Sequence, residues 1–486
     1  MTQSARTVLF ALGAMLSALS LAMLAPALVD LGHEGESAHA FFGSAMLGLA
    51  AGGIMTLLGR SDEHRLTARG AIILTSGAWA VLAFAAALPL QLSGLDISWT
   101  DAIFETTSGL TTTGATVLTG LDDLPRGLLL WRSILQWIGG IGIIVTAMAI
   151  WPMLGIGGMQ LFRLESSEKT EKVLPRAGQI ALAIVIIYLS LTFACFLAYV
   201  ATGMGGFDAV NHAMTTIATG GFSTRDASLG AFTDGGADLV AAIFMILAGL
   251  PFVLYVRAAQ GRPDQLLVDS QARTFLGVIV VAVGVLTVMI TLTPPPPDAS
   301  ALPAWRLALV NAVSIITGTG YASSDFWSWG SGAAAMFLAL MFIGGCAGST
   351  SCSIKIFRYQ IAASAMRSYV EQLTRPNAVS PPRYRGKALP PETVRSVFVF
   401  IFLFFATFTV SAALLSFTGL DTITAISGAA TTLANVGPGL GEIIGPAGSF
   451  APLPDTAKWI MTATMLIGRL EVLVVLVMFT PGFWRR

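Results

Sequence analysis

The stretch LTTTGATV (residues 110–117) decides the fold, because it suits neither a membrane-spanning helix nor an ordinary soluble turn. Three comparable loops follow it: IATGGFST (217–224), ITGTGYAS (316–323) and LANVGPGL (433–440). Their central glycines are Gly114, Gly221, Gly320 and Gly437, and six residues before each lies a hydroxyl side chain, Ser108, Thr215, Ser314 or Thr431. An interval of about 100 residues between such glycines indicates an internal fourfold repeat.

The composition identifies the bilayer as the solvent of most of the chain. Of its 486 residues, 55% are hydrophobic and only 11% are charged, with a mean hydropathy of +0.76, whereas a soluble domain carries about 25% charged residues. Apolar stretches of roughly 20 residues, enough to cross a bilayer as a helix, recur throughout. The predicted spans are 7–30, 38–59, 69–92, 127–152, 177–202, 236–258, 273–293, 333–357, 394–418 and 456–481. The first is expected to be a retained helix rather than a signal peptide.

Four semi-apolar segments between these spans are too short to cross the membrane; they are 98–112, 206–219, 304–318 and 421–435. Such segments are tolerated at membrane depth only where protein or a watery cavity surrounds them, so we interpret them as re-entrant pore helices. The predicted fold is an all-α polytopic membrane protein with four pseudo-symmetric helix–pore loop–helix repeats around a central pore, plus two extra N-terminal helices. The predicted domains are the helix pair 1–60 and the repeats 61–165, 166–262, 263–375 and 376–486.

Glycine loops that meet on one axis can replace the water around a cation. Backbone carbonyls supply oxygens without a fixed charge that would trap the ion, as in potassium-channel filters, and glycine permits the unusual backbone path. The carboxyl ends of the pore helices add partial negative charge, and Asp101 and Asp208 are placed to cap two of these helices. Taken singly, each loop is better explained as a glycine turn at a helix end; four copies at even spacing favour a pore.

Lysine and arginine predict the orientation through the positive-inside rule. With both termini inside, the inner segments hold most of the basic residues, and the inner loop from about 358 to 395 alone holds seven. The outer side keeps only Arg126, Arg132, Arg225, Arg306 and Lys458, among many acidic residues. Either these acids form a mouth that concentrates cations, or they are simply the charges that the positive-inside bias leaves on the outer side.

The loops resemble the Trk, Ktr and HKT superfamily of potassium transporters, most closely its TrkH/TrkG branch. The resemblance spans nearly the whole chain and is carried by TTTGATVLTGLD (111–122), TGGFSTRDAS (219–228), GTGYASSDF (318–326), GGCAGSTSCSIK (344–355), NVGPGLG (435–441) and GRLE (468–471). It implies one pore from four repeats, a homodimer in the bilayer of the bacterial cytoplasmic membrane, potassium as the transported ion and no organic cofactor. It also implies control by a TrkA-like cytosolic nucleotide-binding subunit, and no nucleic-acid partner is expected.

The resemblance also assigns the residues that contact the metal ion. They are Thr112, Thr113, Gly114, Thr219, Gly220, Gly221, Gly318, Thr319, Gly320, Asn435, Val436 and Gly437. Relatives that favour sodium often have serine at the first of these glycines, so Gly114 favours potassium. Tyr321 replaces a common phenylalanine, and Asn435 with Pro438 replaces a threonine strand. We therefore expect weaker selectivity than in a symmetric filter.

The run GGCAGSTSCS (344–353) is the second candidate site. Its glycines should interrupt a helix, since each costs about 1 kcal/mol there. The resemblance places a gate here, formed by Gly344, Gly345, Gly348, Lys355 and Arg469. Close helix packing through small residues is the alternative for the run. Arg469 is a lone cation in an apolar span, where a charge normally faces the protein interior; in the family it forms an electrostatic barrier, and a structural ion pair is the alternative. Glu471 is expected on another face of that helix.

Gated, passive potassium uptake is the function that these patterns favour, because entry into a negative cell gains about 2.3 kcal/mol per 100 mV without a coupled reaction. Proton- or sodium-coupled symport is the alternative within the same class, and a non-conducting receptor is another. A membrane enzyme would need a nucleophile and a base within reach, and only His212 with Ser108 or Ser314 could be proposed. A packing or hydrogen-bonding role is expected for His212. MLGIGGM (153–159) lacks the strand context of a dinucleotide site, so nucleotide control must come from a partner.

Overall fold

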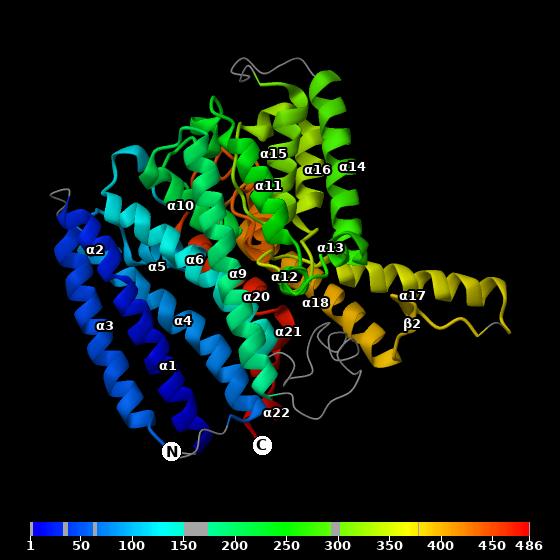
Figure 1. Cartoon of the computed structure of the whole chain (residues 1–486), viewed down its shortest axis with the longest axis horizontal. Helices are drawn as coiled ribbons and strands as arrows, with labels where there is room; N and C mark the ends of the chain where they lie inside the picture. Colours follow the sequence, from blue (N-terminus) through cyan, green and yellow to red (C-terminus); the bar gives the residue numbers. More distant parts are fainter. Residues whose placement is uncertain are drawn as a thin grey trace.

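The computed structural model of the chain describes residues 3–32, 37–61, 66–149, 174–292, 302–377 and 379–485. Within these ranges the regular elements are helices, apart from one short hairpin of β1 (Arg383–Tyr384) and β2 (Lys387–Ala388). Among the described residues, seven helices are long and apolar enough to cross a membrane, and two bent pairs bring the number to nine if each pair is one span. The prediction of an all-α polytopic membrane protein is confirmed (Figure 1). The MLGIGGM motif lies outside the described residues.

An N-terminal group of helices lies at one edge of the molecule (Figure 1). It consists of α1 (Gln3–Ala22), α2 (Leu24–Leu31) and α3 (Ser37–Gly59). The backbones of α1 and α3 approach closely, because a Cβ at Gly13 would lie only 2.6 Å from the carbonyl oxygen of Gly52. Small residues at such a crossing allow the close packing that associates helices in lipid. The predicted extra helices are therefore present, with the first span divided at Met23.

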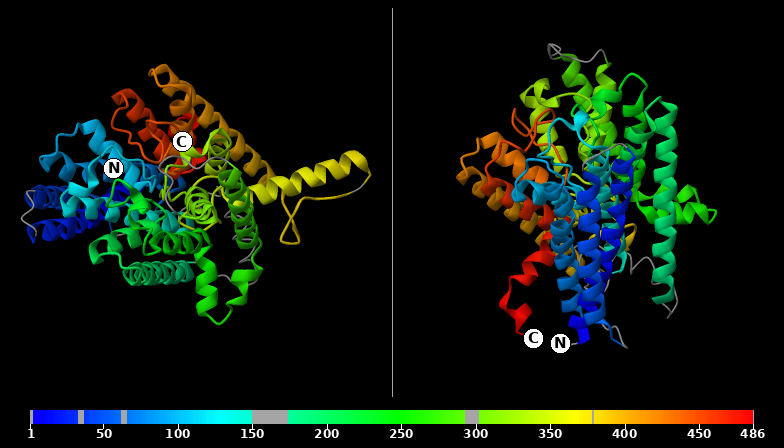
Figure 2. Two further views of the ribbon diagram at one scale, coloured as in Figure 1. Left: turned by 90° about the horizontal axis from the view of Figure 1, so that it is seen from above. Right: turned by 90° about the vertical axis from the view of Figure 1, so that its left-hand side faces the viewer.

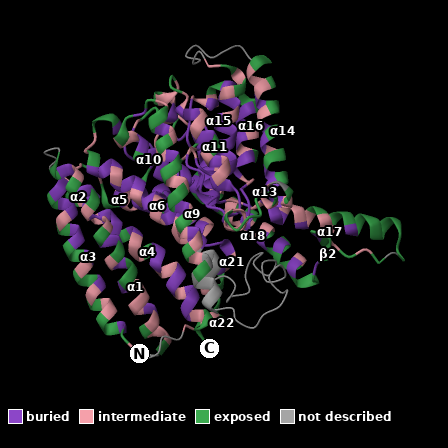
Figure 3. Ribbon diagram, viewed as in Figure 1, coloured by how far each residue is buried: buried purple, intermediate pink, exposed green. Residues whose placement is uncertain are grey.

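Four segments follow, and each contains a long helix, a short buried helix, a glycine loop and a further helix. In chain order these helices are α4 (Ala68–Leu92), α5 (Trp99–Leu110) and α6 (Arg126–Ala149); α9 (Leu174–Ala201), α10 (Gly206–Ile217) and α11 (Ala237–Gly249); α14 (Ser270–Leu292), α15 (Ala304–Thr317) and α16 (Ser331–Met341); α18 (Pro391–Phe417), α19 (Thr422–Ala434) and α20 (Asp455–Arg469). The short helices bury their carboxyl-terminal halves at the centre of the molecule (Figure 3). Short 3₁₀ helices η1 (Leu121–Asp123), η2 (Ser228–Phe232) and η3 (Phe326–Trp329) follow the first three loops.

Besides the first, three of the predicted spans are not continuous helices. Span 236–258 bends by 88° between α11 and α12 (Phe252–Ala259), at Pro251, because proline has no N–H and a fixed φ. Span 456–481 bends by 111° between α20 and α21 (Val472–Met478), which α22 (Pro481–Trp484) follows. Span 333–357 is wrong as a crossing helix, since α16 has 11 residues and a glycine-rich loop takes the rest. A helix of that length extends only about 17 Å.

The capping of the short helices differs from the prediction. Ser98 caps α5, because its hydroxyl accepts a hydrogen bond from the N–H of Asp101, and Asp101 lies inside the first turn. Gly205 precedes α10, and Asp208 is likewise inside the helix. Asp421 does cap α19 by accepting from two backbone N–H groups. Both carboxylates predicted as caps instead form ion pairs, which are described below.

A long arm projects from the body of the molecule (Figures 1 and 2). It consists of α17 (Ile356–Thr374) and the β1–β2 hairpin, and α18 returns from it to the body. Its apolar side chains Met366, Tyr369 and Leu373 are each more than 60% exposed. In the sequence, the short helix α13 (Asp264–Val268) lies between α12 and α14. The arm begins at Ile356, directly after the glycine-rich loop.

Candidate functional site

The four glycine loops leave their short helices in the same way. In each loop the N–H of the residue before the glycine donates to the carbonyl of the hydroxyl residue six positions before the glycine. The bonds are Thr113 to Ser108, Gly220 to Thr215, Thr319 to Ser314 and Val436 to Thr431, at 2.8 to 3.0 Å. Because a trans peptide points its N–H and C=O in opposite directions, these bonds leave the carbonyls of the preceding residues, Thr112, Thr219, Gly318 and Asn435, facing away from the helix ends.

Each loop also contains two residues with positive φ, two positions apart. The second of the two is the central glycine, with φ of +83° at Gly114, +77° at Gly221, +81° at Gly320 and +114° at Gly437. The first is Thr112, Thr219, Gly318 or Asn435. A left-handed conformation costs a non-glycine residue of order 1–3 kcal/mol, and asparagine tolerates it better than threonine. The surrounding packing must hold Thr112 and Thr219 in this conformation.

The four loops close into a ring in the order of the sequence. A Cβ at Gly114 would lie 2.2 Å from the carbonyl oxygen of Gly220, and one at Gly221 would lie 1.9 Å from that of Thr319. The series continues from Gly320 to the Val436 oxygen at 1.9 Å and from Gly437 to the Thr113 oxygen at 2.8 Å. Real Cβ atoms essentially never approach so closely, so a side chain at any of these positions would force one of the two loops to shift. We call these eight residues the glycine ring; its four central glycines line one cavity, which Arg225 and Asp226 also line.

Side chains of the short helices hold the strands beyond the ring. At the position nine residues before the glycine, Glu105 accepts from the N–H of Val117, and Asn311 accepts from that of Ser323. His212, at the equivalent position in α10, bonds Ser223 Oγ through Nε2 and the Asp208 carbonyl through Nδ1. The prediction of a hydrogen-bonding role for His212 is confirmed.

Two residues that the sequence did not single out support the ring from α6. The Arg132 guanidinium is buried, pairs with Glu105 at 2.8 Å and donates to the Ser223 carbonyl, so it joins the first two repeats. One turn further, Gln136 donates to the Gly220 carbonyl at 2.6 Å and accepts from the Phe222 N–H. Their spacing of four residues inside an apolar span was the signal that could have identified them.

The glycine-rich loop lies between α16 and α17, and it is folded back on itself. The Gly344 N–H donates to the Ile354 carbonyl, and a Cβ at Gly344 would lie 2.0 Å from the Cys352 oxygen. Gly345 and Gly348 lie in the same loop. The predicted interruption of the helix is therefore confirmed. The loop also fills the break between α11 and α12, because the Cys346 N–H bonds the Gly249 carbonyl.

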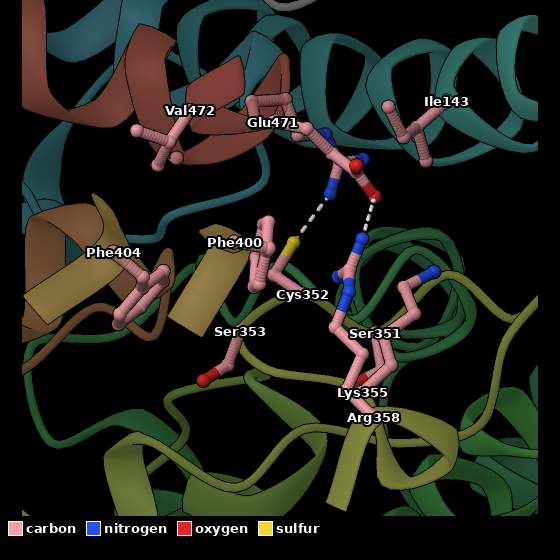
Figure 4. A pocket seen from close by; sticks show the side chains of 12 residues that line it. Ile143, Ser351, Cys352, Ser353, Lys355, Arg358, Phe400, Phe404, Glu471 and Val472 are labelled. Atoms are coloured by element: carbon pink, nitrogen blue, oxygen red, sulfur yellow. Dashed lines mark hydrogen bonds and ion pairs between the residues drawn. The ribbon is translucent and has the colours of Figure 1, made fainter. Parts of the chain in front are cut away.

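A small pocket, the inner pocket, lies between this loop and α20 (Figure 4). The Arg469 guanidinium donates to Cys352 Sγ and, at 2.9 Å, to the Gly139 carbonyl of α6. Cys352 Sγ in turn lies 3.8 Å from the hydroxyl of Thr112, directly before the glycine ring. Lys355, which precedes α17, lines the same pocket. The structure thus brings the predicted gate residues Lys355 and Arg469 together, with a cysteine between Arg469 and the ring.

A buried ion pair at the inner pocket joins Arg358 and Glu471. Their side chains approach to 2.8 Å, and Arg358 lies 3.5 Å over the ring centroid of Phe400 (Figure 4). Glu471 has φ of +64° and occupies the break between α20 and α21, so the helical-face argument used for it was wrong. Its ion-pair partner in the structure is Arg358 rather than Arg469. The inner pocket therefore carries three basic side chains and one carboxylate.

Ion pairs neutralise much of the predicted acidic mouth. Arg225 bridges Asp122 and Asp208, Arg306 pairs with Asp238, and Lys458 with Asp101. Hydrogen bonds from the Asp226 backbone N–H and from Arg225 lower the pKa of Asp122 below its usual value. The outer acids therefore serve partly to fix loops of different repeats to one another, since Asp122 and Asp208 belong to repeats 1 and 2.

Comparison with known proteins agrees with this geometry. The family model described as TrkH, cation transport protein, matches residues 37–485. This chain belongs to the TrkH family. It is 44% identical over 469 residues to the Trk system potassium uptake protein TrkI of Halomonas elongata, covering 96% of this chain and 94% of that protein. It is 39% identical over 486 residues to the Trk system potassium uptake protein TrkH of Vibrio parahaemolyticus, covering 99% of each.

The fold of a TrkH family member is also shared in detail. The crystal structure of the potassium transporter TrkH from Vibrio parahaemolyticus matches with a TM-score of 0.90 at 37% identity, over 99% of both chains. The sequence resemblance is therefore confirmed along nearly the whole chain, and the TrkH family is one of transporters rather than enzymes. The hydroxyl of Ser314 donates to the Tyr321 carbonyl, so it is not oriented as a nucleophile for His212.

Proposed function

We propose that this chain takes up potassium across a bacterial cytoplasmic membrane through the glycine ring, as the names of its TrkH family relatives suggest. The observation that carries the proposal is the closure of the ring, in which the glycine of each repeat meets a carbonyl of the next repeat. Such a ring offers four inward-facing sets of backbone oxygens to one dehydrated cation. The transported ion is K⁺, and the proposal requires no organic cofactor.

The proposed ion ligands are the carbonyls of the glycine ring and of the residues before it. The twelve residues are Thr112, Thr113, Gly114, Thr219, Gly220, Gly221, Gly318, Thr319, Gly320, Asn435, Val436 and Gly437. Their repeats are not equivalent, because Gln136 occupies one lone pair of the Gly220 carbonyl. Asn435 Nδ2 donates to the Thr113 hydroxyl and so ties repeat 4 to repeat 1. We expect these unequal walls to give a lower potassium-to-sodium preference than four identical ones.

The proposed gate is the inner pocket together with the glycine-rich loop. Three cationic groups, Lys355, Arg358 and Arg469, oppose a permeating cation there, and only Glu471 offsets them. At 4 Å, two unit charges of the same sign repel by about 4 kcal/mol at an effective dielectric constant of 20. The conformation described is therefore closed to potassium. Opening requires Gly344, Gly345 and Gly348 to let the loop withdraw and Arg469 to leave the axis.

A cytosolic nucleotide-binding subunit like TrkA is the proposed partner, acting on a homodimer with both termini in the cytoplasm. Two features support the position of this partner. The exposed arm of α17 and the hairpin carries a cluster of basic residues, including Arg367, Arg375 and Arg383, which the positive-inside rule assigns to the cytoplasm. The arm also continues directly from the gate loop. A regulator that moves the arm therefore acts on the gate loop without entering the membrane.

Rubidium uptake into proteoliposomes tests the filter. The variant Gly114→Ser places a side chain against the Gly220 carbonyl, and we expect the preference for rubidium over sodium to fall about tenfold, which corresponds to about 1.4 kcal/mol. The matched control is Gly94→Ser, because Gly94 has a similar φ of +80° and open space around its Cβ. Equal ion preference in the two variants would remove Gly114 from the filter. Uptake at fixed voltage and varied pH separates a channel from a proton symporter.

A further inference from the structure

An apolar cavity of about 410 Å³ lies between α1, α4 and α6, away from the ion path. Met15 and Ala18 of α1 form its outer side, and Ile138 and Gly142 of α6 line it from within. Its one hydroxyl, that of Thr75, donates to the Ala71 carbonyl in its own helix. Apart from this hydroxyl and the Trp79 indole, its lining side chains are hydrocarbon or thioether, so the cavity offers mainly apolar contacts. Apolar cavities of this kind stay dry and bind apolar molecules.

The depth of the cavity restricts what occupies it. Met15 lies near the middle of the 29-residue segment Gln3–Leu31, and it is 44% exposed. At 1.5 Å per residue, the start of that segment is about 18 Å away, which is more than half of the roughly 30 Å hydrocarbon core of a bilayer. At this depth the surrounding solvent is lipid acyl chain, and a charged headgroup does not reach it.

The inner wall of the cavity is in contact with the gate arginine. The Trp79 ring lines the cavity, and the Arg469 guanidinium lies over this ring at 5.7 Å. Gly139 also lines the cavity and accepts the Arg469 hydrogen bond on its carbonyl. Leu110, the last residue of α5, completes this wall, three residues before Thr113 of the glycine ring. Two of the described contacts of Arg469 are thus made by groups whose other side borders the cavity.

We propose that this cavity binds one acyl chain of a membrane phospholipid and that the bound chain holds Trp79 and Gly139 against Arg469. The chain replaces the missing packing behind both groups, so its presence stabilises the closed position of the arginine. The lipid is thereby a regulator of conduction. The binding site stands on the cavity alone, whereas its effect on flux rests on the proposed role of Arg469 in the gate.

Photo-crosslinking tests the binding. The protein is reconstituted in nanodiscs that contain a phosphatidylethanolamine with a diazirine near the middle of one acyl chain, irradiated and mapped by peptide mass spectrometry. We expect labelling of the segments around Met15, Thr75 and Gly142. The variant Gly142→Trp fills the cavity without a backbone clash, because its Cβ meets no atom within 4 Å, and it should lower this labelling at least fivefold. Gly77→Trp is the matched control, since Gly77 has equally open space on α4 but lies outside the cavity lining.

Labelling that is absent from these segments, or that persists equally in Gly142→Trp and in a second filling variant, Ala18→Trp, would overturn the acyl-chain site. The labelling pattern of the unmodified chain decides the matter even if a variant fails to fold. Rubidium flux tests the coupling. Because the indole of Gly142→Trp would occupy the cavity permanently, whereas an acyl chain exchanges with the bilayer, it should hold the closed position more firmly and lower flux at least threefold, and this effect should vanish in an Arg469→Gln background. If Gly142→Trp loses the labelling but its rubidium flux is unchanged, the coupling is overturned. If Arg469→Gln alone leaves the rubidium flux unchanged, the result counts against the gate and leaves the lipid site in place.

Discussion

The glycine ring and the inner pocket beneath it are built on opposite principles. In the ring, four repeats contribute the same hydrogen bond, the same pair of positive φ angles and the same contact with the next repeat. Below it, the helices that follow the four loops differ. The described part of α6 is unbroken, α11 bends by 88° into α12, α16 stops after 11 residues, and α20 bends by 111° into α21.

Under the proposed function, the difference follows from what each region has to do. A cation that has lost its water needs oxygens on all sides, so a ring requires an equivalent contribution from every repeat. A barrier needs only one charge at one place, and a moving loop needs space that three copies of itself would occupy. Arg469 and the glycine-rich loop therefore occur once each. The ring can keep its fourfold symmetry although the following helices differ, because the breaks in those helices begin below the short helices that carry the ring.

The largest expected effect breaks the symmetry of the ring. Gly221→Ala and Gly320→Ala each place a Cβ 1.9 Å from a carbonyl of the next repeat, so one strand must move. We expect rubidium uptake to fall about 100-fold, the scale on which a displacement of about 1 Å acts on a preorganised site. Gly437→Ala should cost less, about tenfold, because its nearest carbonyl is 2.8 Å away.

The control for this series is Gly203→Ala, in which φ is +89° but nothing lies within 4 Å of the added Cβ. It imposes backbone strain without any contact in the ring and should keep uptake close to that of the unchanged chain. If the loss at Gly437 equals that at Gly320, then backbone strain rather than closure of the ring determines transport. The ranking thus separates the two explanations.

A comparison of two buried arginines sharpens the contrast between the regions. Arg132→Gln leaves the carboxylate of Glu105 buried and unpaired, which destabilises by about 3–5 kcal/mol. Arg469 donates to a cysteine sulfur and a carbonyl, so Arg469→Gln strands no carboxylate. We expect a lower unfolding temperature for the Arg132 variant, and higher rubidium flux with little change in unfolding temperature for the Arg469 variant. Thermal unfolding in detergent measures the first effect, and rubidium flux in liposomes measures the second. If instead the Arg469 variant were destabilised and the Arg132 variant conducted faster, Arg469 would have the structural role and Arg132 the role of the barrier.

The sequence predicted the symmetric region much better than the asymmetric one. The four loops were identifiable because Gly114 and its counterparts recur with hydroxyl residues at a fixed distance, and repetition separates a signal from chance. The bend at Glu471 had no such support, since a single carboxylate in an apolar run is equally compatible with a continuous helix. The pairing of Arg132 with Glu105 depends on two helices meeting, which spacing along one helix cannot give. Asp101 and Asp208 were misassigned as caps because their ion-pair partners were not evident from the sequence. Lys458, the partner of Asp101, is distant in the sequence, and Arg225, the partner of Asp208, lies beyond the glycine loop.

The smallest expected effect concerns the junction of repeats 1 and 2 at the outer mouth. The pKa of Asp122 is lowered by the Asp226 N–H and by Arg225, so its ionised form is favoured by folding. A carboxylate with a lowered pKa contributes stability that is complete above its unfolded value of 3.8 and is lost as the pH falls through the folded value. The unfolding temperature of Asp122→Asn should therefore lie below that of the unchanged chain by a constant margin near neutral pH. The two unfolding temperatures should converge below about pH 3.8. The margin should be small because the Asp122 side chain is 47% exposed. A margin that widens in acid would mean that Asp122 is protonated more readily in the folded chain, and Arg225 would then hold the repeats together through Asp208 alone.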